Sequence, residues 1–237
     1  MSGIAYSSPR GAFFGAVRDY ARVPAVAMAA GFVGFGAIVR DSGLDIFQAM
    51  VSSAGMTQIP AQIVMVESAQ AGAGLAGIVL AVAFIGARLV PMAVSLVPML
   101  KPDVRHRSEL YAGAFILSTM AWTHSMRRCP DLPAGQRMPY FWGIALANVV
   151  VVVTGTAVGH ALAGTVAPEI LIGLVFLTPV FFLLLFAAES PDRSGVMALA
   201  FGAVLGPAIH ILSPEWSVLG GGVLAGTAAF ALGHFRS

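Results

Sequence analysis

The sequence predicts an all-α integral membrane protein with about seven to eight transmembrane helices, two of them broken within pseudo-repeated units. Of its 237 residues 58% are hydrophobic and 10% are charged, and the mean hydropathy is +0.86. Soluble domains carry about 25% charged residues. Five stretches also lack Asp, Glu, Lys and Arg, and most approach the roughly 20 residues that a spanning helix needs: 110–126, 138–168, 170–188, 194–214 and 216–235.

Residues 1–22 place three arginines among aromatic and aliphatic side chains, which is typical of an interfacial helix on the cytoplasmic side of a membrane. The apolar runs that follow predict eight helices: 23–39, 46–66, 72–100, 108–126, 139–163, 167–188, 194–212 and 215–235. The loops between them are short. Residues 1–237 are therefore expected to form one transmembrane domain, without a soluble catalytic or ATP-hydrolysing part.

The Lys and Arg residues of the loops predict a cytoplasmic N-terminus, because short cytoplasmic loops are enriched in these residues. If every segment crosses, the N-terminal side holds Arg10, Arg18, Arg22, Arg127, Arg128, Arg137, Arg193 and Arg236, and the other side holds Arg40, Lys101, Arg105 and Arg107. Both loops flanking 108–126 are nevertheless basic. Either this segment dips into the membrane and returns, or the charge rule is broken once.

A weak internal repeat relates 31–66 to 155–188, since Asp45-Ile46 aligns with Glu169-Ile170 and each pair precedes a helix with an interior proline. This alignment predicts repeat units of about 23–100 and 139–212, each containing a broken helix. The repeats are parallel if 108–126 crosses and inverted if it does not. Broken helices at matching positions are a pointer to a transporter's substrate site.

The most polar stretch inside an apolar segment is "SSAGMTQIPAQ" at 52–62. Pro60 and Gly55 predict a break around 55–60. The main-chain groups freed there would bind a charged or zwitterionic ligand, with side chains adding neutral donors and acceptors. The substrate-binding candidates of this stretch are Ser53, Gly55, Thr57, Gln58 and Gln62. The alternative is that they only pack helices together.

The residues "GLDIFQAMVSSAGMTQI" resemble the "AGASQF" region of the AzlC family, the large subunits of branched-chain amino-acid permeases. "GFVGFG" at 31–36, "GARLVPMAVSLVPML" at 86–100 and "PEILIGLVFLTPVFFLLLF" at 168–186 follow in the family's order. The resemblance implies export of an apolar amino acid and a small hydrophobic AzlD-type partner subunit. This chain departs from the family at Gly86, where relatives have Asn, and at Thr119-Met120-Ala121, where they read Thr-Asp-Glu.

Arg88 is the only charged residue between Glu67 and Lys101, and it is a further substrate-binding candidate because intramembrane arginine is costly and by default functional. The alternative is a helix that ends near residue 90, with Arg88 reaching the membrane interface. Asn148 and Thr178 are weaker candidates for lining a cavity. His124 is a candidate coupling group, because it lies just after the missing acids.

These observations predict a secondary permease that exports branched-chain or other small apolar amino acids by alternating access, in the bacterial cytoplasmic membrane. The alternatives are a non-transporting assembly subunit and a permease of changed substrate. We expect no enzyme activity, no cofactor and no metal site, since the histidines lack metal-ligand spacing and no catalytic motif lies in the spans. The few basic residues lie in short loops, so nucleic acid is not an expected partner.

Overall fold

The computed structural model describes residues 6–104, 106–189, 193–212 and 217–234, without some side chains after residue 167. The chain divides into two compact units, Met1–Thr178 and Pro179–Ser237, and each is described by itself. Among the described residues the only regular secondary structure is helical, as predicted.

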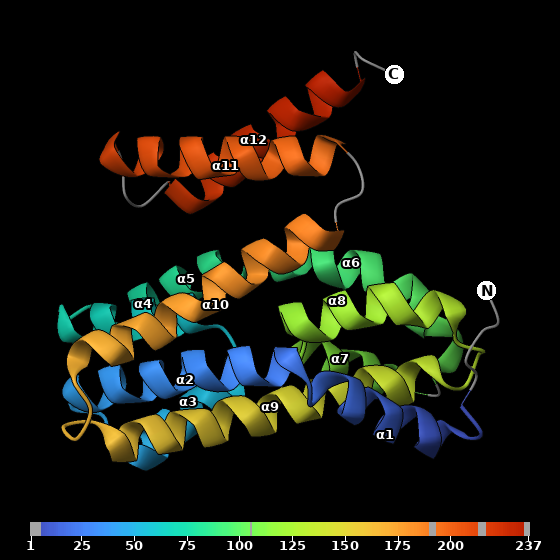
Figure 1. The fold of residues 1–237 in the computed structure, drawn as a ribbon, viewed down its shortest axis with the longest axis horizontal. Helices are drawn as coiled ribbons and strands as arrows, with labels where there is room; N and C mark the ends of the chain where they lie inside the picture. Colours follow the sequence, from blue (N-terminus) through green and yellow to red (C-terminus); the bar gives the residue numbers. More distant parts are fainter. Residues whose placement is uncertain (1–5, 105, 190–192, 213–216, 235–237) are drawn as a thin grey trace. The chain divides into compact units, whose positions relative to one another are not determined.

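Two long helices, α2 (Val23–Asp41) and α9 (Arg137–Leu162), form the scaffold of the first unit (Figure 1). The two helices approach closely because glycines of α9 lie where they contact α2. A Cβ on Gly155 would lie 3.0 Å from the Ala29 carbonyl oxygen, and one on Gly159 would overlap the main chain of Val33. Gly155 and Gly159 form a GxxxG pair, the spacing that allows helix backbones to pack tightly.

Helix α1 (Pro9–Tyr20) packs lengthwise on α9 (Figure 1). It buries Ala12, Ala16 and Tyr20, which are spaced four residues apart on one face, and it exposes Arg10 and Arg18. The buried face of this amphipathic helix lies against α9, and its location at a membrane interface stays a prediction.

The segment predicted at 46–66 is a pair of helices, α3 (Ile46–Gly55) and α4 (Ile59–Gln70), that turns back on itself. The Gln70 side-chain amide donates to the Ser42 carbonyl at 3.4 Å, so the end of α4 returns to the start of α3. Each helix is only about 15–18 Å long, well short of the roughly 30 Å hydrocarbon core of a membrane. The break is confirmed, but the segment is a hairpin rather than one crossing.

The segment predicted at 72–100 is also broken, into α5 (Leu75–Gly86) and α6 (Leu89–Leu100). The two parts, with α6 extended by the short 3-10 helix η1 (Lys101–Asp103), meet at 54°. The expectation of a continuous helix here is therefore wrong.

The segment predicted at 108–126 is a second hairpin, made of α7 (Arg107–Phe115) and α8 (Thr119–Arg128). The Asp103 carboxylate, which precedes α7, accepts hydrogen bonds from the N–H groups of Gly135 and Arg137 at 2.7 Å and of Met138 at 3.2 Å. The chain before α7 and the chain after α8 and the 3-10 helix η2 (Cys129–Asp131) are thus held at one end of the unit. Of the two alternatives, the segment that dips and returns agrees with the structure.

The remaining helices are α10 (Pro168–Glu189), α11 (Arg193–Leu212) and α12 (Ser217–His234), of which α11 and α12 pack together. Helix α10 continues through Pro179, so the predicted break there is wrong and the proposed match between 31–66 and 155–188 loses its main support. By length and composition, two described helices can cross a membrane, Val23–Asp41 and Arg137–Leu162, or three segments if the bent pair α5–α6 counts as one span.

Candidate functional site

The break between α3 and α4 lies where the sequence places Gly55 and Pro60. Pro60 occupies the first turn of α4, where its missing N–H costs nothing. Met56, Thr57 and Gln58 link the helices, and Met56 and Gln58 are extended. Within the described part of the chain, the N–H groups of Thr57 and Gln58 donate to no other residue. These two amides are available to a ligand at the hairpin tip.

Three breaks converge on one cavity of about 310 Å³. It is bounded by the tip of the α3–α4 hairpin, by the bend of α5–α6, and by the tip of the α7–α8 hairpin. Its lining residues are Ala54, Gly55, Met56, Thr57, Gln58, Ala61, Val82, Ala83, Gly86, Leu89, Phe115, Ile116 and Leu117. The volume lies at the lower end of the range of ligand pockets, about 300–1,000 Å³. The only polar side chains among these residues are Thr57 and Gln58, so the cavity is apolar with polar groups concentrated at one hairpin tip.

Three of the predicted site residues, Gly55, Thr57 and Gln58, line this cavity. Arg88 lies beside it, between the lining residues Gly86 and Leu89, and its Nε donates to Gln58 Oε1 at 2.9 Å. Arg88 is therefore at a helix break rather than in the middle of a continuous helix. Its side chain is exposed, and the hydrogen bond joins the tip of α3–α4 to the bend of α5–α6.

Ser53 and Gln62 are fully buried behind the hairpin tip and do not line the cavity. The Gln62 side-chain amide donates to the main-chain carbonyls of Ser52, at 3.1 Å, and of Met56. In a continuous helix the ring of Pro60 would clash with the main-chain carbonyl of Met56, four residues earlier. Because Gln62 donates a hydrogen bond to this carbonyl, it stabilises the break that Pro60 imposes. The two buried residues support the tip from behind.

Ser53 links the hairpin to the scaffold through a hydroxyl pair with Thr156 of α9, at 2.7 Å. Thr156 donates its own proton to the Val152 carbonyl at 2.9 Å, so Ser53 is the donor of the pair. All these oxygens are buried. The alternative prediction, that the polar residues of 52–62 pack helices together, therefore describes Ser53.

Asn148 and His124 do not join the cavity. Asn148 is buried and accepts from the Tyr20 hydroxyl at 2.7 Å, which fastens α1 to α9. His124 lies on α8, where its Nδ1 is 3.0 Å from the Met120 carbonyl and its ring meets Tyr20 edge-on. The side chain of Thr178 lies outside the described residues.

Sequence reasoning missed most of the cavity's apolar wall, contributed by α5, α6 and the tip of α7–α8. Gly86 was noticed only as a departure from relatives, yet a Cβ placed there would meet no atom within 4 Å and would point into open space. The basic loops on both sides of 108–126 were the one signal that α7–α8 returns. Phe115, Ile116 and Leu117 read as ordinary apolar residues and gave no signal.

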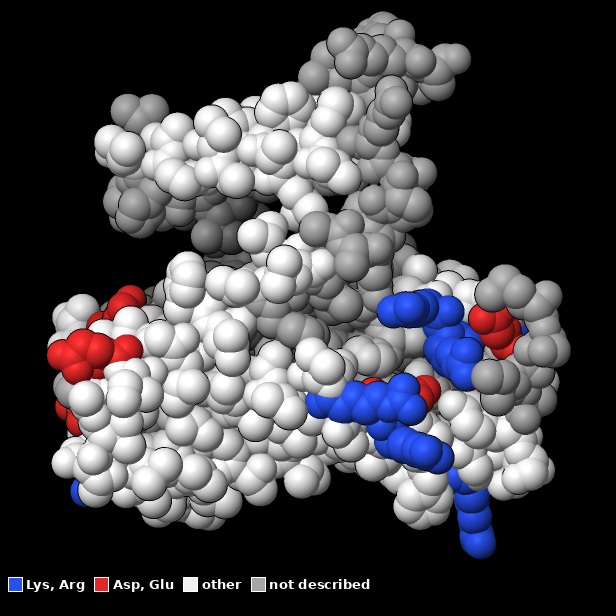
Figure 2. Space-filling view, in the orientation of Figure 1, with Lys and Arg blue, Asp and Glu red and all other residues white. Residues whose placement is uncertain are grey.

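The Lys and Arg residues of the first unit are concentrated at one of its two ends, whereas Asp and Glu residues lie at both. Figure 2 shows most of the basic side chains at the end with α1 and α8, together with some acidic ones, and a cluster of acidic side chains at the opposite end. Because α7–α8 returns, its two flanking loops lie at the same end, which moves Lys101 and Arg107 from the side they would occupy if every segment crossed. The basic end now holds Arg10, Arg18, Arg22, Lys101, Arg107, Arg127, Arg128 and Arg137, and the other end has Arg40 among the described residues of this unit.

Comparison with known proteins gives one match. The family described as AzlC protein matches residues 24–166, which is more than half of the chain and includes both hairpins, the bent pair and every residue lining the cavity. No curated protein and no solved structure matches the chain. The apolar candidate spans and this match together identify a membrane protein with a role related to transport, and the chain belongs to the AzlC family.

Proposed function

We propose that the chain is the large subunit of a secondary permease that exports a branched-chain or other small apolar amino acid by alternating access. It acts in the bacterial cytoplasmic membrane, as a multi-pass protein, with a small hydrophobic AzlD-type partner. The observation that carries the proposal is the cavity at which three discontinuous helices meet. Substrate sites of secondary transporters are typically built in this way, from half-helix ends near the middle of the membrane.

The cavity matches the chemistry of an apolar amino acid. The start of α4 presents the free N–H groups of Thr57 and Gln58 and the positive end of a helix dipole, both of which suit a carboxylate. Arg88 uses its Nε on Gln58, and its terminal nitrogens, which bond to no described residue, can bind the same carboxylate as a fork. The carbonyl end of α3 suits the ammonium group. Val82, Leu89 and Phe115 provide an apolar wall for the side chain.

The cavity has no charged lining residue, which favours a substrate whose side chain is neutral. Moving a charged substrate side chain from water into this cavity, where no lining side chain could pair with it, would cost several kcal/mol. The open space at Gly86 is where relatives of the resembled family carry Asn, so this chain is expected to accept a bulkier apolar side chain than those relatives do.

Transport by the purified protein tests the proposal. The chain is reconstituted into vesicles with its partner subunit, and exchange of radiolabelled valine, leucine and methionine is measured. Gly86→Trp fills the cavity and is expected to abolish exchange. Gly77→Trp is the matched control, because Gly77 is on the same helix, is exposed and does not line the cavity.

Saturable exchange that Gly86→Trp leaves unchanged would refute this site. Exchange that persists in Gln58→Ala and Arg88→Ala variants, together with ligand-induced stabilisation seen only in the partner, would favour a non-transporting assembly subunit. Saturable exchange of other amino acids only would indicate a permease of changed substrate.

A further inference from the structure

The cavity at the three breaks is larger than a branched-chain amino acid requires. An apolar cavity of about 150 Å³ accommodates a benzene molecule. At about 310 Å³, this cavity has room for such a ring together with the charged head of an amino acid. The isopropyl group of valine has fewer than half the carbon atoms of a benzyl group. With valine bound, part of the apolar wall would therefore lack a contact, and the dispersion attraction of that contact would be lost.

The wall of the cavity leaves space for a flat side chain. Five lining residues are alanine or glycine, and all of them belong to α3, α4 and α5: Ala54, Gly55, Ala61, Ala83 and Gly86. A Cβ built on Gly86 would meet no atom within 4 Å. A ring can therefore approach the main chain of α5 at this position, because glycine has no side chain to hold it off.

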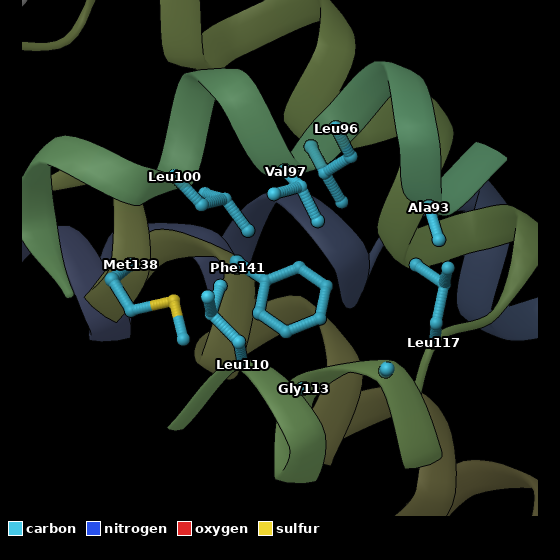
Figure 3. A pocket seen from close by; sticks show the side chains of 10 residues that line it. Ala93, Leu96, Val97, Leu100, Leu110, Gly113, Leu117, Met138 and Phe141 are labelled. Atoms are coloured by element: carbon cyan, nitrogen blue, oxygen red, sulfur yellow. The ribbon is translucent and has the colours of Figure 1, made fainter. Parts of the chain in front are cut away.

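A neighbouring region of the same unit shows how a ring packs beside a glycine. In Figure 3 the ring of Phe141, from α9, lies between α6 and α7. It sits directly on α7, because a Cβ on Gly113 would lie only 3.2 Å from Phe141 Cε1. The hollow that remains there measures about 30 Å³ and is lined by apolar residues. Leu117 lines both this hollow and the cavity at the three breaks, where no atom lies within 4 Å of the Cβ position of Gly86.

Phe115 supplies an aromatic side chain at the cavity. It lines the cavity from the end of α7 and is 71% exposed, so most of its surface remains uncovered. Among the described residues, none makes a ring contact with Phe115. Aromatic pairs that stack with an offset or meet edge to face gain more than their buried area alone provides. The ring of a substrate would give Phe115 the aromatic neighbour that the described chain does not.

We propose that the cavity selects amino acids with an aromatic side chain, phenylalanine above valine and leucine, and that Gly86 and Phe115 bound the place of the ring. This inference rests on the proposed transport function and extends the substrate class of the same site beyond the branched-chain amino acids. The carboxylate binds at the start of α4 and at Arg88, as for any amino acid. The ring then fills the apolar part of the cavity, against the small residues of α3, α4 and α5.

Competition between amino acids tests the preferred side chain. The chain is reconstituted into vesicles with its partner subunit, and exchange of radiolabelled leucine is measured in the presence of unlabelled phenylalanine or valine. The concentration of phenylalanine that halves exchange is expected to be at least about tenfold lower than that of valine, because a single methylene in an apolar pocket already changes selectivity by about 10- to 200-fold.

Filling the place beside Gly86 is expected to remove this preference. In Gly86→Val the half-inhibitory concentration of phenylalanine is expected to rise at least about tenfold, whereas that of valine stays within about twofold. Gly77→Val is the matched control, because Gly77 lies on the same helix, is exposed and does not line the cavity. Phe115→Leu keeps an apolar side chain and removes the ring, so it is expected to weaken phenylalanine by about two- to tenfold and to leave leucine unchanged.

Phenylalanine that competes no better than valine, in a protein that exchanges leucine, would overturn the inference and leave the proposed function standing. Equal effects of Gly86→Val and Gly77→Val on phenylalanine would overturn it as well. If no amino acid is exchanged, the proposed function fails, and thermal unfolding of the purified complex decides the inference, because a ligand that binds the folded state raises the unfolding temperature. Stabilisation by phenylalanine at a concentration at least about tenfold lower than that of valine, lost in Gly86→Val, would support an aromatic site without transport. Any other result of this measurement would overturn the site.

Discussion

The buried hydroxyl pair behind the hairpin tip predicts an unequal response to two similar substitutions. Ser53 donates to Thr156, which in turn donates to the Val152 carbonyl. In Thr156→Val the Ser53 proton loses its acceptor inside the protein. In Ser53→Ala the Thr156 proton keeps its acceptor. The first variant is therefore expected to be the less stable one, although each removes a single hydroxyl.

The magnitudes follow from the burial of both residues, which are 0% exposed. Leaving a buried donor unpaired costs about 1–3 kcal/mol, whereas losing one ordinary hydrogen bond costs about 0.5–1.5 kcal/mol. Thr156→Val is expected near the upper range and Ser53→Ala near the lower. The double variant is expected to be less destabilised than the sum of the two, because the unpaired donor is gone.

Equilibrium unfolding of the reconstituted protein measures these differences. Thr156→Ser serves as control, since it keeps the hydroxyl and loses only a methyl group. Equal losses for Ser53→Ala and Thr156→Val, with additivity in the double variant, would refute the assigned direction of the hydrogen bond. In that case Ser53 would not be the fixed donor of the hydroxyl pair behind the tip.

Three other consequences can be measured. Gly159→Val is expected to abolish assembly of the first unit, because any side chain there meets the main chain of Val33. The yield of folded protein in detergent measures this effect, and a normal yield would contradict the prediction. Cys129 is buried, which raises the pKa of its thiol to about 12. Alkylation at pH 8 is therefore expected to be slow in the folded protein and fast after denaturation. In the folded protein the rate is expected to rise only as the pH approaches 12. Asp103→Ala removes the acceptor of three main-chain hydrogen bonds, so limited proteolysis is expected to cut the loops flanking α7–α8 faster than in Asp103→Glu; identical cutting would show that the carboxylate does not hold these loops.

The long helices and one of the three breaks could be predicted from the sequence. Uniform apolar runs defined 23–39 and 139–163, which lie within two residues of α2 and α9. The break after Gly55 was predictable because Pro60 excludes a continuous helix locally. The break at Ala87–Arg88 has no proline at the bend itself, and Pro91 sits within the first turn of α6, where proline is tolerated.

The candidate site was predictable only where its signal was local. Thr57 and Gln58 stand out as polar residues in an apolar segment, and they line the cavity. The tip of α7–α8 contains neither glycine nor proline, so its break depends on the capping of α8 by Ser118 and on packing with distant helices. Ser53, Gln62 and Asn148 lie in buried hydrogen bonds away from the cavity, which the sequence could not tell apart from ligand contacts because both use the same residue types.

The Asp103 clamp has a consequence for how the protein is made. Its three partners lie 32–35 residues further along the chain, so Asp103 leaves the ribosome well before any of them. The base of the second hairpin can therefore close on Asp103 only after the start of α9 has been synthesised.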